Sequence, residues 1–179
     1  YFQNSSGSVV ASGIPTYLLT ALSECQTTAS CLGTSDEHKT TINYGPQLAG
    51  LGNNLLIATV SDGSGNGALT ATTSYIYDAR GNRVFVDGAL PGAADITRTI
   101  YDGAQQIVGI IGPDPDGVGV LKNRATRFSY NLNGQVTNTE IGNVNGQSDP
   151  DWVAMIVLQN VADTYDPNAR AVKQQWQAS

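Results

Sequence analysis

Hydrophobic and polar residues alternate in short runs from about residue 40 onward. The clearest run is SYIYDARGNRVFVDG (74–88), in which an apolar and aromatic stretch, an Asp and a Gly precede the alternating Val84 and Val86. Alternation with a period of two on both sides of turn-forming residues predicts a β-hairpin. Other runs rich in Thr, Val, Ile and Tyr are separated by Gly, Asn, Asp and Pro. The pattern therefore predicts an all-β chain of antiparallel hairpins.

The hairpin pattern recurs along the chain. The stretches TIYDGAQQIVGIIGP (99–113), FSYNLNGQVTNTEIG (128–142) and DTYDPNARAVKQQ (163–175) align with it, and TINYGPQ (41–47) begins a more distant copy. Such self-similarity indicates a repeat architecture, because one hairpin alone is only marginally stable in water and its copies must pack together. The aligned residues of the predicted repeat motif are Tyr77, Asp78, Gly81, Tyr101, Asp102, Tyr130, Asn131, Gly134, Tyr165 and Asp166.

Each motif position has a predicted structural role. The tyrosine lies on a strand, where its ring can stack on the equivalent ring of a neighbouring strand. The Asp or Asn accepts hydrogen bonds from main-chain N–H groups in an Asx turn, and the glycine supplies a left-handed backbone conformation. Gln105 and Ala169 occupy the glycine position, so those two turns must differ in type or tolerate strain.

Asn131 indicates that the motif is structural rather than catalytic. It stands where the other clear copies have Asp. An amide preserves an Asx turn, whereas it would abolish the role of a general acid or of a carboxylate metal ligand.

Several segments depart from the repeat pattern. SDPDWVAMIVLQ (148–159) begins with a Ser and has a Pro near the first helical position, which predicts a short helix of two or three turns near 150–160; a buried strand is the alternative. Residues 1–8 are interpreted as a vector or tag remnant and 9–39 as an irregular segment. The repeat region is assigned to 40–175, which leaves a tail at 176–179.

Composition and charge argue against two classes of partner. Charged residues make up 13% of the chain, about half the usual fraction, and the formal net charge is −6. The nine Lys and Arg residues are scattered, so we expect no binding to nucleic acid, which depends on clustered cations. No apolar run approaches the ~18 residues of a membrane span, so we expect no membrane insertion.

The two cysteines predict a local disulfide. Cys25 and Cys31 are separated by five residues rich in Thr and Ser, a spacing typical of small loops in exported proteins, with two reduced thiols as the alternative. The sequence offers few candidate catalytic or metal-binding residues. His38 is the single histidine, and Asp114 and Asp116 resemble the start of a calcium loop without its remaining ligands. We therefore expect no enzymatic activity, no cofactor and no metal site.

The linked copies of YIYDARGNRVFVDG and IYDGAQQIVGIIGPDPDG resemble the YD-repeat (Rhs) family of bacterial proteins over residues 40–175. The resemblance implies a curved, open β-sheet strip that forms part of a shell around a C-terminal toxin, in a secreted or surface-delivered protein. Four or five copies are too few to close a shell, so the chain is expected to be a fragment. Its expected partners are the remainder of the parent protein, the C-terminal cargo, and further copies pairing at the edge strands.

One alternative function remains open from the sequence. Aromatic residues repeated along a sheet can stack on sugar rings, so a cell-surface adhesion or carbohydrate-binding module would also explain the tyrosines. The two hypotheses differ in where the rings lie, since an adhesive module needs them exposed to solvent.

Overall fold

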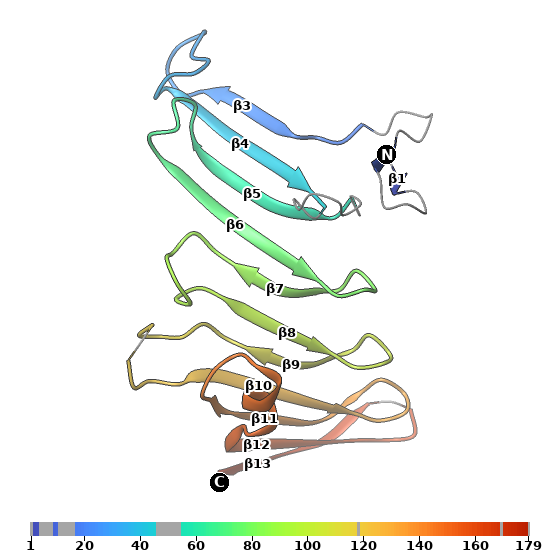
Figure 1. Cartoon of the computed structure of the whole chain (residues 1–179). Coiled ribbons are helices and arrows are strands. Elements are labelled where there is room, and N and C mark those ends of the chain that lie inside the picture. Colours follow the sequence, from blue (N-terminus) through green and yellow to red (C-terminus); the bar gives the residue numbers. More distant parts are fainter. Residues whose placement is uncertain are drawn as a thin grey trace. The chain divides into compact units, whose positions relative to one another are not determined.

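The computed structural model describes residues 2–3, 9–10, 17–45, 55–117, 119–168 and 170–178. Strands β3 to β13 are ordered along one sheet as they are along the chain (Figure 1). Two short strands, β1 (Phe2–Gln3) and β2 (Val9–Val10), form a separate antiparallel pair. Within the described part of the chain, no helix has the length and apolar character required to cross a membrane.

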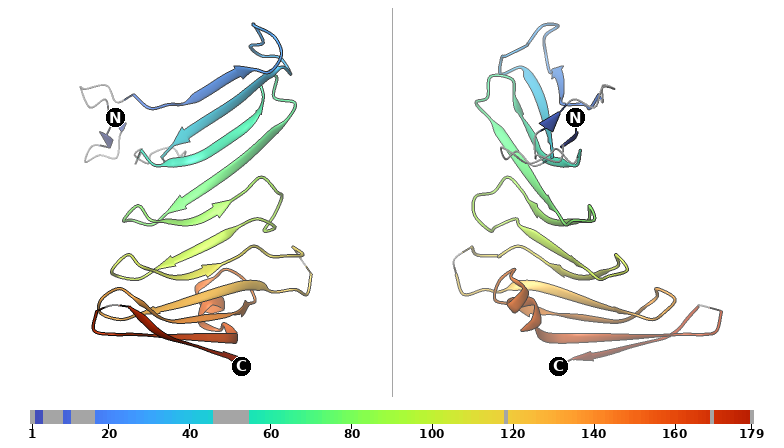
Figure 2. Two further views of the ribbon diagram at one scale, coloured as in Figure 1. Left: turned by 180° about the vertical axis from the view of Figure 1, so that it is seen from behind. Right: turned by 45° about the vertical axis from the view of Figure 1, so that its right-hand side comes forward.

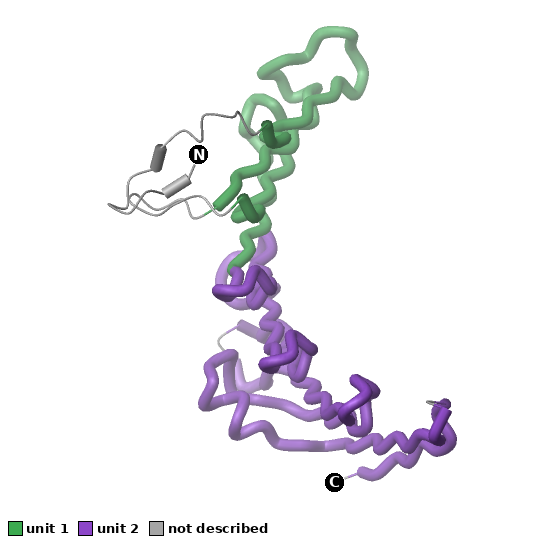
Figure 3. Tube along the Cα trace, turned by 90° about the vertical axis from the view of Figure 1, so that its right-hand side faces the viewer, with its two compact units in different colours: residues 1–76 green, residues 77–179 purple. Residues whose placement is uncertain are grey.

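The chain divides into two compact units, residues 1–76 and 77–179 (Figure 3). In the first unit, Thr- and Val-rich segments pair antiparallel in chain order, as expected of residues that favour a pleated, half-buried surface. The hydroxyl groups of Ser61 and Thr72 lie 2.8 Å apart across one such pair. The strands are β3 (Ala21–Cys25), β4 (Glu37–Tyr44), β5 (Ile57–Ser64) and β6 (Thr70–Tyr77).

The second unit contains three hairpins of one form, each with five residues between its strands. The hairpins are formed by β8 with β9, β10 with β11, and β12 with β13. The elements are β7 (Arg83–Asp87), β8 (Thr97–Tyr101), β9 (Ile107–Ile111), β10 (Asn123–Tyr130), β11 (Val136–Val144), α1 (Asp149–Val153), β12 (Ile156–Tyr165) and β13 (Ala171–Ala178).

The helix begins where the sequence predicts and ends earlier. Ser148 caps α1 through a capping box with Asp151, and Pro150 lies in its first turn. The helix ends at Val153, and the residues from Ile156 onward form β12 rather than further helical turns. Pairing of this β-branched segment with β11 outweighs its apolar spacing. The predicted helix of two or three turns is therefore wrong in length, and the alternative of a strand applies from residue 156.

The core of the second unit lies between the sheet and the segment containing α1. Its buried residues are packed against the partly buried Trp152 of α1, whose ring covers Gly109 of β9. The ribbon views show the α1 segment lying beside the strands near β10 and β11 (Figures 1 and 2). A Cβ at residue 109 would come within 2.5 Å of the Trp152 ring, so the close approach requires a glycine. The core consists of Ile111, Ala125, Val144 and Met155, with Ile100 and Val157 alongside.

Polar contacts fix the α1 segment on the sheet. The Arg98 guanidinium donates to the Gln147 carbonyl at 2.6 Å and forms an ion pair with Asp149. The Gln147 side chain donates to the carbonyl of Gly112 at 2.9 Å. Arg127 lies 4.7 Å from the centre of the Trp152 ring, a distance that permits a cation–π contact. The covered face is therefore held by both apolar and charged groups.

The predicted fold class is confirmed: over the residues that the structure describes, the chain is all-β, its hairpins are antiparallel, its sheet is open, and one short helix is present. The segment boundaries differ from those expected. Strand β3 lies within the segment interpreted as irregular, and β4 begins at Glu37, before the expected start of the repeats at residue 40. Strand β13 continues to Ala178, so residues 176–178 belong to a strand rather than to a tail.

Candidate functional site

The repeated turn is organised around one acceptor side chain. In the first clear copy, the main-chain N–H groups of Arg80 and Asn82 each donate to Oδ1 of Asp78 at 2.9 Å. The N–H of Gly81 donates to the Asp78 carbonyl at 3.1 Å, and the N–H of Asp78 donates to the Asn82 carbonyl at 2.9 Å. The side chain thus satisfies the main-chain donors that the turn leaves without a strand partner.

The other copies repeat these contacts at equivalent positions. In each, the residue aligned with Asp78 accepts from the N–H groups two and four residues later. These pairs are Asp102 with Ala104 and Gln106 (2.8 and 2.9 Å), Asn131 with Asn133 and Gln135 (2.9 and 3.1 Å), and Asp166 with Asn168 and Arg170 (both 2.9 Å).

A further side-chain bond closes three of these turns. Asn82 and Arg170 donate to Oδ2 of Asp78 and Asp166, at 3.0 and 2.8 Å. At Asn131 the direction reverses, because its amide nitrogen donates to Oε1 of Gln135 at 2.7 Å. The Asn copy therefore keeps the same bond with donor and acceptor exchanged, which explains why a carboxylate is not needed there.

The fourth residue of the turn adopts the left-handed conformation. Gly81 and Gly134 have φ of 88° and 76°. Gln105 has φ of 65° at the aligned position, so the turn containing Asp102 keeps its type at the cost of a strained non-glycine residue. Ala169, the other exception noted in the sequence, lies outside the described residues.

The turns favour the ionised form of two of their carboxyl groups. The Asn82 side-chain amide, aided by the main-chain N–H groups of Asn82 and Arg80, lowers the pKa of Asp78. The main-chain N–H and the guanidinium of Arg170 lower the pKa of Asp166. Hydrogen bonds to a carboxylate stabilise the charged form, so both groups are held as anionic turn acceptors.

The motif tyrosines bond to the preceding hairpin. The hydroxyl of Tyr130 on β10 donates to the Ile107 carbonyl at 2.6 Å, and that of Tyr165 on β12 donates to the Val136 carbonyl at 2.7 Å. Tyr101 on β8 reaches the Arg83 carbonyl at 3.4 Å. Each acceptor lies five residues after the Asp or Asn of the preceding turn, at the first residue of its return strand. The tyrosine therefore joins consecutive repeats.

This geometry corrects the expectation that the rings stack on one another. Tyr77, Tyr101 and Tyr130 lie on β6, β8 and β10, with one strand between each tyrosine and the next. Strands two positions apart are separated by about 9.5 Å. Stacked aromatic rings have centroids roughly 4.5–7 Å apart. The hydroxyl-to-carbonyl bond, which spans a single strand boundary, takes the place of stacking.

A β-bulge accompanies the motif tyrosine in four hairpins. The register shifts at Tyr44, Tyr101, Tyr130 and Tyr165, each time leaving the second residue of the return strand without a Cα partner. The Tyr44 hydroxyl also donates to the Leu19 carbonyl at 2.9 Å. TINYGPQ therefore begins a hairpin that shares the bulge and the tyrosine bond, although residues 46–54 of its turn lie outside the described part.

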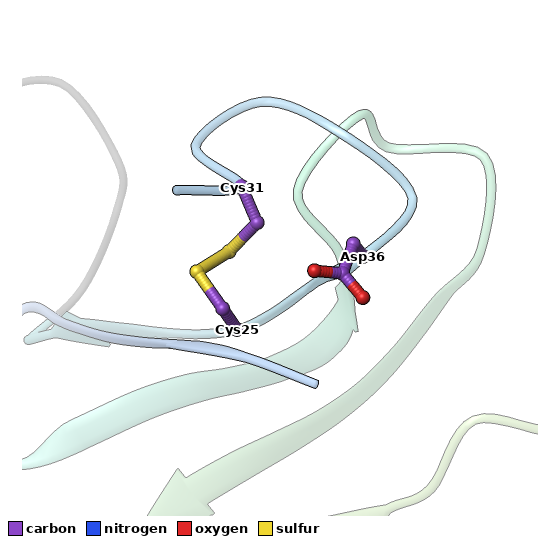
Figure 4. A group of neighbouring side chains, drawn as sticks. All are labelled: Cys25, Cys31 and Asp36. Carbon is purple, nitrogen blue, oxygen red and sulfur yellow. A yellow bond between two sulfur atoms is a disulfide. The ribbon is translucent and has the colours of Figure 1, made fainter. Parts of the chain in front are cut away.

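Cys25 and Cys31 form a disulfide in the first unit, beside Asp36 (Figure 4). Metals bind cysteine as the thiolate, so the bonded sulfurs do not act as metal ligands in this state. The Asp36 carboxylate is itself engaged, because its oxygens accept from the N–H groups of Thr27 and Thr28 at 3.0 and 2.9 Å. The hydroxyl groups of these two threonines lower the pKa of Asp36. Asp36 thus organises the disulfide loop.

A buried carboxylate that sequence analysis did not single out lies next to this loop. Glu37 is 1% exposed, and it accepts from the Gly33 N–H at 2.6 Å and from the Ser23 hydroxyl. These bonds, with that of Ser23 first, lower its pKa. The neighbouring His38 pairs with Glu24 at 3.2 Å on the surface. The sequence showed only a polar run here, since the burial of Glu37 depends on contacts from outside its own strand.

The carboxylates of Asp114 and Asp116, in the DPDG stretch, also accept hydrogen bonds from main-chain N–H groups. Oδ1 of Asp114 accepts from the N–H groups of Asp116 and Gly117, at 3.2 and 3.1 Å. Oδ2 of Asp116 accepts from the Leu121 N–H at 3.1 Å. These are the bonds of a turn, as the Pro-containing turn hypothesis expects.

Comparison with known proteins identifies a similar fold. No protein-family model and no curated protein matches the sequence. Among solved structures, the crystal structure of TcdB2-TccC3-Cdc42 matches with a TM-score of 0.52 and 15% sequence identity over 77% of this chain. The match spans 7% of the length of that chain. At this identity the similarity concerns the fold.

Proposed function

We propose that this chain is a structural YD-repeat segment of a secreted or surface-delivered bacterial protein of the Rhs type. In this proposal its hairpins form part of a β-sheet wall that encloses or presents a C-terminal toxin, and they carry out no catalysis of their own. The partners are the remainder of the parent protein and its cargo. The similarity to a chain of the TcdB2-TccC3-Cdc42 structure that is about eleven times longer, because 77% of this chain matches 7% of that one, supports a place within a larger assembly.

The observation that carries the proposal is the repetition of one set of contacts. Each clear hairpin uses an Asp or Asn to satisfy its own turn, and the tyrosines of three successive hairpins bond to the strand before them. When each repeat contacts mainly its neighbours, further copies can be added to the sheet with the same set of contacts. The Asp and Asn side chains of the motif and the hydroxyls of three of its tyrosines are engaged in these contacts, which favours a structural role over substrate chemistry.

The disulfide supports an exported protein. Disulfides persist in oxidising compartments and are rare where glutathione keeps thiols reduced. Cys25 and Cys31 form this disulfide with each other, and the described residues include no free cysteine.

Limited proteolysis of the full-length parent protein tests the proposal. If the repeats enclose a cargo, the region that follows them should resist a protease that rapidly degrades the same region expressed alone. A matched variant with Tyr130→Ala and Tyr165→Ala removes two connections between repeats and should increase cleavage of the cargo. Equal cleavage rates of the cargo with and without the repeats would contradict an enclosing role.

A further inference from the structure

An open groove of about 670 Å³ lies on the second unit, across the strands β10 to β13. Arg124 and Asn143 alternate with the buried Ala125 and Val144, so this is the sheet face opposite the core and α1. The volume is within the range of small-molecule sites. None of the motif residues lines the groove, so its properties are independent of the proposed structural role.

The groove has a charge opposite to that of the protein. Its ten lining residues include Lys122 and Arg124 and no Asp or Glu, although acidic residues outnumber basic ones by 15 to 9 in the chain. Both cations are exposed, and neither forms an ion pair with another described residue. An anionic group would therefore find two cations without an ion-pair partner among the described residues and no carboxylate among the lining residues. The carboxylate of Asp116, near Lys122, is engaged by the N–H of Leu121.

The opposite side of the groove presents an aromatic ring. Trp176, on the edge strand β13, is 61% exposed, and β11 and β12 separate it from the strand that carries Arg124. An indole ring exposed on a flat sheet offers a surface for the apolar face of a sugar ring. Arg124 and Trp176 are three strand spacings apart, about 14 Å across the sheet. They are also offset along the strands, because Arg124 is level with Asn143 and Trp176 is level with Thr139, about 13 Å away on β11. This separation suits a ligand longer than one sugar.

Amide side chains line the space between these two ends. Asn143 and Gln159 can each donate to and accept from hydroxyl groups. Gln177 alternates with Trp176 along β13, so its side chain belongs to the other face of the sheet. Oδ1 of Asn143 is buried and accepts no hydrogen bond from the described residues. Rotation of the Asn143 side-chain amide would let this oxygen accept from a ligand hydroxyl group. A ligand rich in hydroxyl groups matches this lining better than an apolar one.

We propose that this groove binds an acidic oligosaccharide, with a uronic acid carboxylate at Lys122 and Arg124 and a sugar ring against Trp176. The location differs from that of the tyrosines, which the sequence suggested as a sugar-binding surface and which bond to main-chain carbonyls instead. The ligand class follows from three observations together: the cations, the exposed indole and the intervening amides.

Calorimetric titration of the 179-residue protein with trigalacturonic acid tests the proposal, and the methyl ester of the same trisaccharide is the matched uncharged ligand. The acid should bind with heat release and change the tryptophan fluorescence, whereas the ester should bind about tenfold more weakly. Arg124→Gln should reduce acid binding about tenfold and leave ester binding unchanged. Lys173→Gln, which removes a charge outside the groove, should leave both affinities unchanged.

Trp176→Ala should weaken binding of both ligands, whereas Leu132→Ala, at an exposed turn residue, should not. Circular dichroism and thermal unfolding of each variant separate lost binding from lost folding, and Trp176→Phe keeps a ring if the Ala variant fails to fold. Absence of heat and of a fluorescence change at millimolar acid would overturn the proposal. Equal affinity for acid and ester, or equal effects of Arg124→Gln and Lys173→Gln, would also overturn it.

Discussion

The hydroxyl of Tyr130 donates a 2.6 Å hydrogen bond to the main-chain carbonyl of Ile107, on the return strand of the preceding hairpin. Tyr165 makes the equivalent bond to Val136 in the next hairpin. The repeat thus contains two kinds of contact, one inside each turn and one between hairpins. Substitutions can separate the two.

Tyr130→Phe tests the contact between hairpins. The variant keeps the ring and removes the donor, so we expect a loss of about 1 kcal/mol in the free energy of unfolding, measured by urea denaturation. Tyr17→Phe removes a hydroxyl from a tyrosine that is 90% exposed and should have no effect. Equal stability of the two variants would contradict a role for the Tyr130 bond.

Asn131 tests the contact inside the turn. Asn131→Ala should cost about 1 kcal/mol, because the N–H groups of Asn133 and Gln135 lose their acceptor. Asn131→Asp keeps that acceptor, and the Gln135 amide can turn to donate to the new carboxylate. We therefore expect the Asp variant to unfold at nearly the same urea concentration as the wild type. A large loss in both variants would mean that the amide itself is required.

The left-handed position predicts a stabilising substitution. Gln105→Gly should relieve the strain at φ of 65°, and we expect a gain of up to about 1 kcal/mol after the greater freedom of glycine in the unfolded chain is subtracted. Gly134→Ala should destabilise by a similar amount, since its φ of 76° disfavours a side chain. Thermal unfolding of the pair should show midpoint shifts of opposite sign, and a destabilised Gln105→Gly would refute the assignment of strain.

The lowered pKa of Asp78 predicts a dependence of stability on pH. Because the folded-state pKa lies below the ordinary value of 3.8, the stabilisation is present above that value and is lost as the pH falls through the folded-state pKa. Asp78→Asn removes this titration. On acidification from pH 7 to pH 3, the wild type should therefore lose more stability in urea than the Asn variant. Parallel losses would show that Asp78 is not the responsible group.

The disulfide predicts an effect of reductant on the first unit. Closing the loop between Cys25 and Cys31 restricts the unfolded chain, so its reduction should cost about 2 kcal/mol. The double variant Cys25→Ser, Cys31→Ser should show the same loss without reductant and no further loss when reductant is added. Further loss in that variant would place the reductant effect elsewhere.

The turns could be predicted from the sequence because their contacts are local. The acceptor at residue 78 and its donors at 80 and 82 occur in one short stretch, and the Asp-to-Asn change at 131 showed that a charge was unnecessary. The partner of the tyrosine hydroxyl could not be predicted, since a main-chain carbonyl leaves no signature in side-chain identity. The predicted length of α1 was wrong because the residues after it pair with β11 as strand β12, which ends the helix early. The groove depends on residues from four strands, which no single motif joins.

The contacts between Arg98 and the segment of Gln147 have a consequence for the order of folding. Hairpins that bond mainly to their predecessors can form one after another as the chain leaves the ribosome. Arg98, however, contacts residues 49 and 51 positions later, and Trp152 completes the core over Gly109. We therefore expect the main-chain N–H groups of the early hairpins of the second unit to exchange with solvent until residue 152 is synthesised. The second unit should become fully protected from hydrogen exchange only when Trp152 packs on Gly109.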